Sequence, residues 1–246
     1  MKKTKIVSGK MAKPILLLVL ACGLFNSSFM TDTKPVFYPV LQTYCETLPG
    51  DFSKIPEERK ETLREIGGFV VAQLNAKQPV NLTYICTHNS RRSQFGQVWA
   101  KVAAVYYGFG NRVFTFSGGT EATAFNVRAV AALQRAGFVT DDDRNPKNPN
   151  HTVRFSESQS LPVMFSKRYS DEANPKSEFC AVMVCSQADE ACPLVYGASA
   201  RVSLPYEDPK NADGKPNETQ AYDETCRLIA RETFYVFDYV RLKMNQ

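Results

Sequence analysis

The sequence has no excess of charge of either sign once its first 21 residues are set aside. Of its 30 basic residues, five are lysines within residues 1–21, a segment without acids, which leaves 25 basic residues against 25 acidic ones. A nucleic-acid-binding domain needs a strongly basic face. The balance therefore argues against a nucleic-acid partner.

The sequence also lacks an N-terminal apolar run long enough to span a bilayer. Residues 15–21 are apolar, follow a lysine-rich start and precede small residues, whereas a spanning helix needs about 20 apolar residues. This pattern predicts an export signal over residues 1–22. Its end resembles a lipobox, so we expect lipidation of Cys22 and an exported protein, periplasmic or anchored to a membrane by lipid. An ordinary signal cleaved after Phe25 and an uncleaved anchor are the alternatives.

Cysteine is too sparse for a fold stapled by disulfides. The chain has seven cysteines in 246 residues, and six remain when Cys22 is set aside. Secreted scaffolds that depend on disulfides have a much higher density of cysteine. Some of the six are therefore candidates for chemistry, although a disulfide framework is the simpler interpretation.

The most informative motif runs from Cys86 to Ser93, between an apolar run and a helical pattern. Backbone N–H groups at a helix N-terminus attract anions, and Arg92 can bind two oxygens of one oxyanion. The same field favours the thiolate of Cys86, which is the attacking form. The motif predicts a nucleophile inside an oxyanion-binding loop; the alternative is a buried cysteine near a surface arginine. The expected oxyanion-binding residues are Thr87, His88, Asn89, Ser90, Arg91, Arg92 and Ser93.

Strand and helix patterns alternate along the chain, without an internal repeat. They predict helices over residues 55–76, 92–107, 126–136 and 217–243, and strands over residues 81–86, 113–116, 151–157, 161–166, 179–185 and 202–204. This order predicts an α/β fold with a mostly parallel sheet, whose strand ends hold the site. We expect a tether or irregular lead-in over residues 23–50, because prolines oppose a helix there, and a catalytic domain over residues 51–246. Residues 139–150 are expected to form a solvated loop, and no metal or cofactor is expected.

Two further segments carry candidate groups. Cys185 ends a predicted strand and Cys192 follows in the next loop, an arrangement that suits thiol–disulfide exchange; the alternative is a structural disulfide between them. Cys180 faces the opposite side of the same strand, and Cys226 lies on the apolar face of a helix. Asp208, just before a proline, can serve as a general acid; the alternative is an ordinary Asp-Pro turn.

Together, the motif at Cys86, the Cys185–Cys192 pair and Asp208 resemble the thioredoxin-coupled arsenate reductases over roughly residues 80–246. These enzymes share the fold of low-molecular-weight protein tyrosine phosphatases. The resemblance implies an open, mostly parallel sheet with helices on both faces, here with an N-terminal helical extension. The loop and the Asp-Pro pair belong to both branches, whereas the cysteine pair belongs to the reductases.

The resemblance also implies a mechanism and partners. Cys86 would attack arsenate bound by Arg92, and Asp208 would protonate the departing oxygen. Cys185 would attack the adduct, releasing arsenite, and Cys192 would then attack Cys185. A thioredoxin-like partner would reduce the resulting disulfide.

The chain departs from the family pattern at several positions. His88 stands where glycine is usual, Arg91 where cysteine is frequent, and Gln97 where some reductases place an acid near a potassium ion. An exported reductase would also need an exported electron donor.

Two other functions stay open. The first is a phosphatase that uses Cys86, Arg92 and Asp208 through a cysteinyl-phosphate, although the tyrosines common after Asp-Pro in that branch are absent. The second is a lipid-anchored protein that binds oxyanions or senses redox state without turnover. The reductase is the function that the sequence favours.

Overall fold

The computed structural model describes residues 1, 37–192 and 194–246. Residues 2–36 include Cys22, almost all of the expected export signal and the first part of the expected tether, so these predictions lie outside the described residues. Among the helices of the described part, none combines the length and apolar character needed to cross a membrane.

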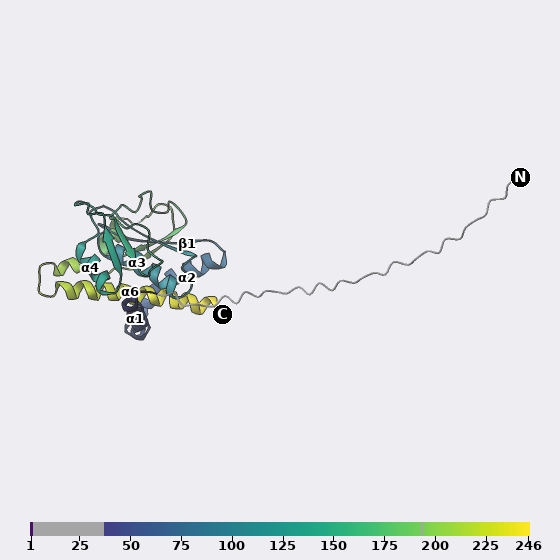
Figure 1. The fold of residues 1–246 in the computed structure, drawn as a ribbon, viewed down its shortest axis with the longest axis horizontal. Coiled ribbons are helices and arrows are strands. Elements are labelled where there is room, and N and C mark those ends of the chain that lie inside the picture. The colour runs from purple at the N-terminus through teal and green to yellow at the C-terminus, as the bar shows by residue number, and fades with distance from the viewer. Residues whose placement is uncertain (2–36, 193) are drawn as a thin grey trace. The chain divides into compact units, whose positions relative to one another are not determined.

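Four parallel strands form the central sheet (Figure 1). They are β1 (Val80–Cys86), β2 (Val113–Gly119), β5 (Phe179–Met183) and β6 (Ala198–Ser203). Their order is β2-β1-β5-β6, and each neighbouring pair is parallel. Strand β5 is buried throughout, as its uninterrupted apolar sequence requires in a sheet covered on both faces. The predicted α/β class is confirmed.

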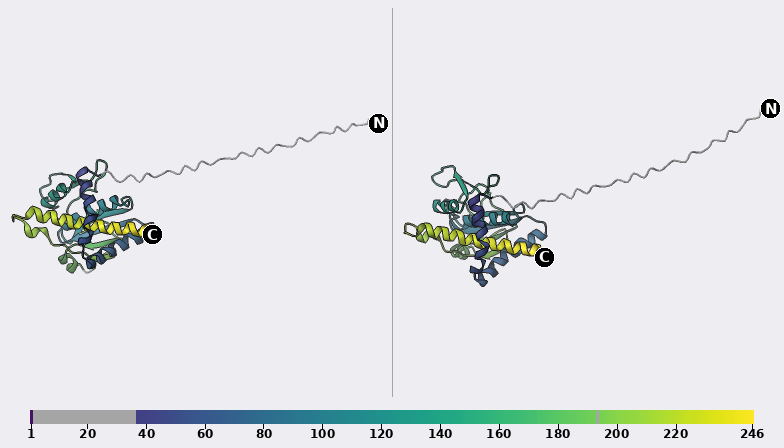
Figure 2. Two further views of the ribbon diagram at one scale, coloured as in Figure 1. Left: turned by 90° about the horizontal axis from the view of Figure 1, so that it is seen from below. Right: turned by 60° about the horizontal axis from the view of Figure 1, so that its bottom comes forward.

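The expectation of an irregular lead-in is wrong for residues 39–50. Helix α1 (Pro39–Thr47) and the 3-10 helix η1 (Pro49–Lys54) form there, each with its proline in the first turn. A proline is tolerated at that position because the N–H that it lacks has no partner inside the helix. Both views of Figure 2 show the first helix crossing the long C-terminal helix α6 (Glu218–Met244).

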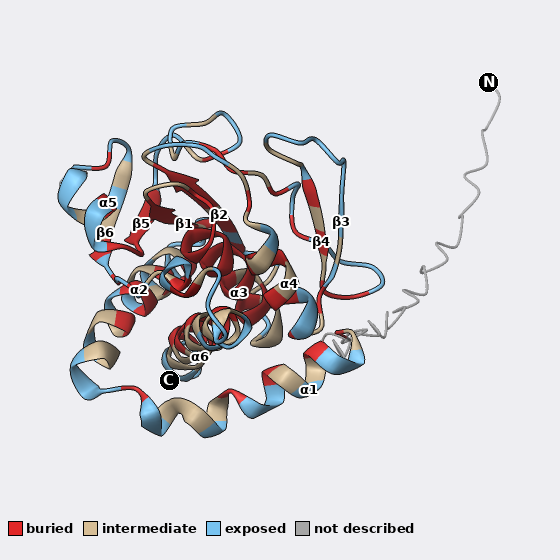
Figure 3. Ribbon diagram, turned by 90° about the vertical axis from the view of Figure 1, so that its left-hand side faces the viewer, coloured by how far each residue is buried: buried red, intermediate tan, exposed pale blue. Residues whose placement is uncertain are grey.

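Helices α2 (Glu57–Asn75), α3 (Arg92–Tyr106) and α6 lie on one side of the sheet, with α4 (Val127–Arg135) beside α6 (Figure 3). Helix α3 lies so close to β1 that a Cβ at Gly96 would collide with the ring of Tyr84. The opposite face is covered by the short helix α5 (Ser186–Ala191) and by the segment around Tyr169, whose backbone touches Gly118.

A second, two-stranded sheet corrects the prediction for residues 139–150. Strand β3 (Val139–Asp142) pairs antiparallel with β4 (His151–Arg154), so that only residues 143–150 form the connecting loop. Strand β3 is mostly exposed, and its acidic sequence has no apolar alternation to reveal a strand. The expected strand over residues 161–166 makes only an isolated bridge, between Met164 and His151.

Trp99 occupies the centre of the helical layer. Its ring stacks on Tyr44 at 5.2 Å and meets the edge of Phe138 at 5.1 Å. Its indole N–H donates to the Sγ of Cys226 at 3.2 Å. Burial raises the pKa of the Cys226 thiol to about 12, which agrees with the expected core role of this cysteine.

The first prediction concerns α1. Leu41 is fully buried, whereas Val40 beside it is 62% exposed. Leu41→Ala should lower the free energy of unfolding by about 2–5 kcal/mol, because it leaves a cavity between α1 and the domain. Val40→Ala, the matched control, should change it by less than about 0.5 kcal/mol. Equal effects in chemical denaturation would show that α1 does not contribute to the core.

The second prediction concerns His151, which is 3% exposed and has no hydrogen-bond partner on either ring nitrogen among the described residues. Burial lowers its pKa, although Asp142 and Asp143 oppose that shift. Below pH 6.5 the unfolded chain therefore binds a proton that the folded chain resists, so stability falls as the pH falls.

His151→Phe should remove this dependence, which amounts to at most about 1.4 kcal/mol per pH unit. Denaturation curves between pH 7 and pH 5 measure it. His88→Asn, which removes the other histidine of the chain, is the control and should keep the slope. A slope that survives in the His151 variant would assign it to other groups.

Candidate active site

The segment between β1 and α3 forms a tight loop that starts at Cys86 and ends at Arg92. Asn89 has a φ of +48°, a left-handed conformation that asparagine tolerates better than most residues. Its side chain makes two hydrogen bonds that fix this turn. The Nδ2 atom donates to the Oγ of Ser93 at 2.9 Å, and the Oδ1 atom accepts from the backbone N–H of Lys167 at 2.9 Å.

Cys86 lies at the bottom of this loop and is 4% exposed. Its Sγ is 3.0 Å from the Oγ of Ser93. Because Asn89 donates to the same oxygen, the Ser93 hydroxyl proton is free to point at the sulfur and to support a negative charge there. Asn89, Ser93 and Cys86 thus form one connected group.

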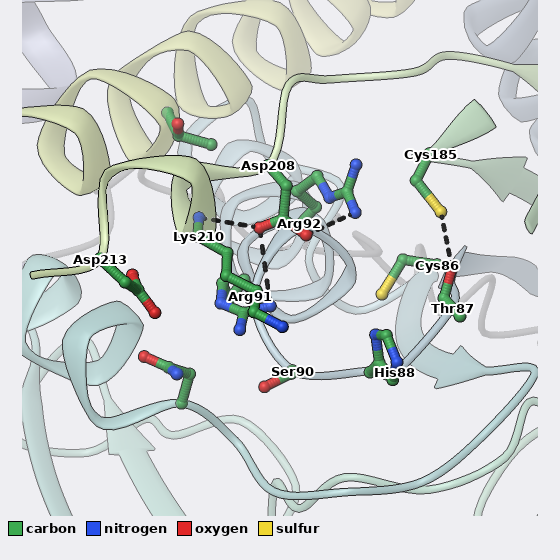
Figure 4. Close-up of polar contacts among 12 residues, drawn as sticks. Cys86, Thr87, His88, Ser90, Arg91, Arg92, Cys185, Asp208, Lys210 and Asp213 are labelled. Carbon is green, nitrogen blue, oxygen red and sulfur yellow. Dashed lines mark hydrogen bonds and ion pairs between the residues drawn. The ribbon is translucent and has the colours of Figure 1, made fainter. Parts of the chain in front are cut away.

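Asp208 reaches this loop from the segment that follows β6 (Figure 4). Arg92 donates through Nη2 to the Oδ2 of Asp208 at 2.7 Å, and through Nη1 to the backbone oxygen of Tyr206 at 2.8 Å. The Nη1 of Arg91 lies 3.6 Å from the other carboxylate oxygen. That oxygen also accepts from the N–H of Lys210 at 3.1 Å. The structure therefore brings the expected nucleophile, arginine and acid into one site.

Several expected oxyanion-binding side chains point to protein partners instead. The Nε of Arg91 donates to the Tyr222 hydroxyl at 3.1 Å, which in turn donates to Asp213 at 2.8 Å. The Ser90 hydroxyl donates to the backbone oxygen of Ala124 at 2.6 Å. These side-chain atoms of Ser90 and Arg91 are therefore already hydrogen-bonded within the protein.

His88 and Thr87 occupy the outer edge of the loop. The His88 side chain is 44% exposed, and its Nε2 lies 3.7 Å from a carboxylate oxygen of Glu121. The Oγ1 of Thr87 lies 3.4 Å from the Sγ of Cys185. Figure 4 shows Cys185 and Cys86 both next to Thr87, so the second cysteine of the expected relay lies beside the oxyanion loop.

Cys185 and Cys192 lie at the two ends of α5. Cys185 is the N-cap residue of this helix and is buried, and its sulfur accepts from the N–H of Ala188 at 3.4 Å. Cys192 follows the last turn and is partly exposed. The six cysteines of the described residues are all free thiols, so the alternative of a structural Cys185–Cys192 disulfide is not realised here.

Neutral polar side chains of β2, of α3 and of the segment around Asn174 form a hydrogen-bonded network near the loop. The Oγ of Ser117 donates to the Oε1 of Gln97 at 2.7 Å, and Nδ2 of Asn174 donates to the backbone oxygen of Ser117 at 3.0 Å. Gln97, which stands where some of the resembled reductases have an acid, thus takes part in an uncharged network. The described residues contain no group of three or more His, Cys, Asp or Glu side chains suited to a metal ion.

Sequence reasoning missed Tyr206 and Tyr222 as part of the site. Neither contact can be predicted from the local sequence, because each depends on the tertiary structure. Tyr206 contributes its backbone oxygen, and Tyr222 contributes its hydroxyl from the first turns of α6. The single usable signal was the position of Tyr206, two residues before Asp208.

Sequence relatives place the chain in a family. No family model matches the chain. Arsenate reductase 2 of Staphylococcus epidermidis is 29% identical over 133 residues, which are 54% of this chain and 79% of that protein. The arsenate reductase of Brevibacillus brevis is 31% identical over 126 residues, 51% of this chain and 74% of that protein.

The chain belongs to the arsenate reductase family. The resemblance expected from the sequence is thereby confirmed. Among solved structures, the low-molecular-weight phosphotyrosine phosphatase of Vibrio cholerae is 13% identical, with a TM-score of 0.44 and coverage of 65% of this chain and 95% of that one. The arsenate reductase of Archaeoglobus fulgidus is 15% identical, with a TM-score of 0.39 and coverage of 62% and 98%.

The third prediction tests the support of the nucleophile in this member of the arsenate reductase family. Ser93→Ala removes the hydroxyl 3.0 Å from the Cys86 sulfur. Alkylation of Cys86 by iodoacetamide at pH 7 should slow about tenfold, because a hydrogen bond to a charged group is lost. Ser90→Ala is the control, since the Ser90 hydroxyl bonds a backbone oxygen away from the sulfur. Equal rates in wild type and Ser93→Ala would exclude this role.

Proposed function

We propose that the protein reduces arsenate to arsenite through a relay of three thiols, Cys86, Cys185 and Cys192. The observation that supports this most strongly is the position of the Cys185 sulfur, 3.4 Å from Thr87 in the oxyanion loop. Phosphoryl transfer needs one thiol, whereas the reduction of arsenate needs two electrons and therefore two thiols near the same anion.

The first half of the reaction uses the oxyanion loop. Arsenate binds to the loop amides and to the guanidinium of Arg92. The Cys86 thiolate attacks arsenic and forms a sulfur–arsenic bond, while one arsenate oxygen departs. Asp208 accepts from Arg92 at 2.7 Å in the free protein. When arsenate displaces it from Arg92, Asp208 would take up a proton from solvent and pass it to the departing oxygen, which leaves as water.

The second half transfers electrons. The Cys185 thiolate attacks the sulfur of Cys86, forming a disulfide, and the electron pair of the sulfur–arsenic bond moves to arsenic, which leaves as arsenite. Cys192 then attacks Cys185, so that Cys86 is released as a thiolate and the disulfide moves to Cys185–Cys192. A thioredoxin-like dithiol reduces this disulfide and restores the protein.

The partly exposed position of Cys192 supports its role as the last thiol of the relay. A reductant must approach the sulfur that it attacks, and Cys86 and Cys185 are both buried. Cys192 is followed by two strongly exposed apolar side chains, Leu194 and Tyr196. The relay thus runs from a buried site toward the surface.

We also propose that the protein is exported. The lysine-rich start and the apolar run of residues 15–21 support an export signal, with lipid attached to Cys22. The electron donor must then also be exported, because a thiol relay works only with a reductant in the same compartment.

A phosphatase is the second candidate, and the Arg92–Asp208 contact favours it as much as it favours the reductase. Cys86 would form a cysteinyl-phosphate, Asp208 would protonate the leaving alcohol, and water would release phosphate. Cys185 and Cys192 would have no part in that reaction.

The fourth prediction separates the two candidates. Cys192→Ser should abolish steady-state arsenate reduction with a thioredoxin-like donor but permit a single turnover, because Cys86 and Cys185 still supply two electrons. Cys86→Ser should abolish both. Arsenite release and hydrolysis of p-nitrophenyl phosphate are measured on the same samples.

The control for this test is Cys226→Ser. Cys226 is buried in the core, where burial raises its pKa to about 12, so its loss should leave turnover unchanged. Phosphate ester hydrolysis that survives loss of Cys185 and Cys192, without arsenate turnover, would replace the reductase with the phosphatase.

A further inference from the structure

A charged cluster outside the oxyanion loop connects the N-terminal extension to the site. Arg59 of α2 donates to both carboxylate oxygens of Glu232 in α6, at 3.2 and 3.1 Å from Nε and at 3.0 Å from Nη2. The carboxylate of Glu232 is almost completely buried, with 3% of the side chain exposed. A buried carboxylate without a partner is strongly destabilising, so this pair fixes the two helices relative to each other.

Tyr206 packs directly on this pair. The guanidinium carbon of Arg59 lies 4.7 Å from the centre of the Tyr206 ring, a cation–π distance. The ring is buried, and no hydrogen bond to its hydroxyl is formed within the described residues. Burial and the nearby Glu232 carboxylate raise the pKa of this hydroxyl well above its ordinary value. The tyrosine is therefore neutral, and its ring is held by Arg59.

The backbone of Tyr206 continues into the site. Its oxygen accepts from Arg92 at 2.8 Å, and its N–H donates to the backbone oxygen of Val184 at 3.2 Å. Val184 directly precedes Cys185, and Asp208 follows Tyr206 by two residues. A shift of the Tyr206 ring would therefore move the backbone that contacts Arg92 and leads to Asp208. It would also move the backbone bond to Val184, next to Cys185.

We propose that Arg59 and Glu232 are positioning residues for the anion site: their ion pair fixes the Tyr206 ring and thereby the placement of Arg92 and Asp208. This inference rests on the proposed function only for the identity of the reaction, because binding of any tetrahedral oxyanion uses the same arginine. Helix α2 would thereby contribute to the anion site from outside the oxyanion loop, because Arg59 acts through the Tyr206 ring.

A second ion pair provides a matched control. Arg227 of α6 donates to Asp51 of η1 through Nε at 3.2 Å and through Nη2 at 2.6 Å. It also joins α6 to the N-terminal extension and also lies over a tyrosine ring, that of Tyr44 at 5.4 Å. Tyr44 belongs to α1 and has no bond to the oxyanion loop. Loss of this pair removes the same kind of interaction without changing the support of Arg92.

The fifth prediction compares Arg59→Gln with Arg227→Gln in the full chain. Inorganic phosphate binding is measured by calorimetry, and arsenate turnover is measured as kcat and KM, at a temperature where melting curves show each variant folded. Arg59→Gln should weaken phosphate binding and lower kcat about tenfold each, because small displacements of an anion-binding group are costly. Arg227→Gln should change both by less than about twofold.

Two further variants keep the test decisive if Arg59→Gln does not fold. Arg59→Lys retains the charge beside Glu232 but loses the planar fork and its stacking, and it should show the same losses to a smaller degree. Arg59→Gln combined with Glu232→Gln should be no worse than Arg59→Gln alone, since the two act as one pair.

Equal phosphate affinity in wild type and both Arg59 variants would overturn the positioning role. So would equal losses in the Arg59 and Arg227 variants, which would indicate a general effect of stability. If the reductase proposal is wrong, the wild type will bind phosphate without reducing arsenate. The comparison of phosphate binding between wild type and the Arg59 variants will still decide the role of Arg59.

Discussion

Arg92 stands in the first turn of α3, but its partners lie far along the chain. Its two terminal nitrogens donate to the Tyr206 oxygen and the Asp208 carboxylate, 114 and 116 positions later. The Arg92 side chain is 8% exposed, and a buried charge without partners is costly. The partners come from the segment after β6, which lies two strands away from β1 in the sheet. Arg92 therefore has its full set of partners only when the sheet is complete.

This constraint explains why the candidate site residues gather at one edge of the sheet. Parallel strands end at the same edge, so the segments that follow β1, β5 and β6 meet there. They contribute Cys86, Cys185 and Asp208, in the order in which the strands neighbour each other. Cys86, Cys185 and Asp208, which are far apart in the sequence, thus meet at the candidate site because the strands before them end at the same edge of the sheet.

The sequence predicted the central elements because their patterns are local. Strands β1 and β5 are nearly continuous apolar runs, and the helical spacing of α2 and α6 spans many turns, so their positions agreed within a few residues. Helix α1 was missed because Pro39 was taken as a helix breaker, although it occupies the first helical position. Strand β3 was missed because Asp141 and Asp142 face solvent and give no alternation. The motifs located Cys86, Arg92 and Asp208, but the contacts of Tyr206 and Tyr222 depend on tertiary packing.

Two of the described cysteines, Cys180 and Cys185, come from one segment of the chain but lie on opposite faces of the central sheet. Cys180 lies in register with Leu82, on the face covered by α2 and α3, and burial raises its pKa to about 12. Burial likewise raises the pKa of Cys45 and Cys226. Only the thiolate exchanges, so these three are inert. Cys185 differs from Cys180 by an odd number of positions and points to the other face, where α5 leads from it to Cys192. Alternation along one strand thus places the buried Cys180 and Cys185, the second thiol of the proposed relay, on opposite sides of the same sheet.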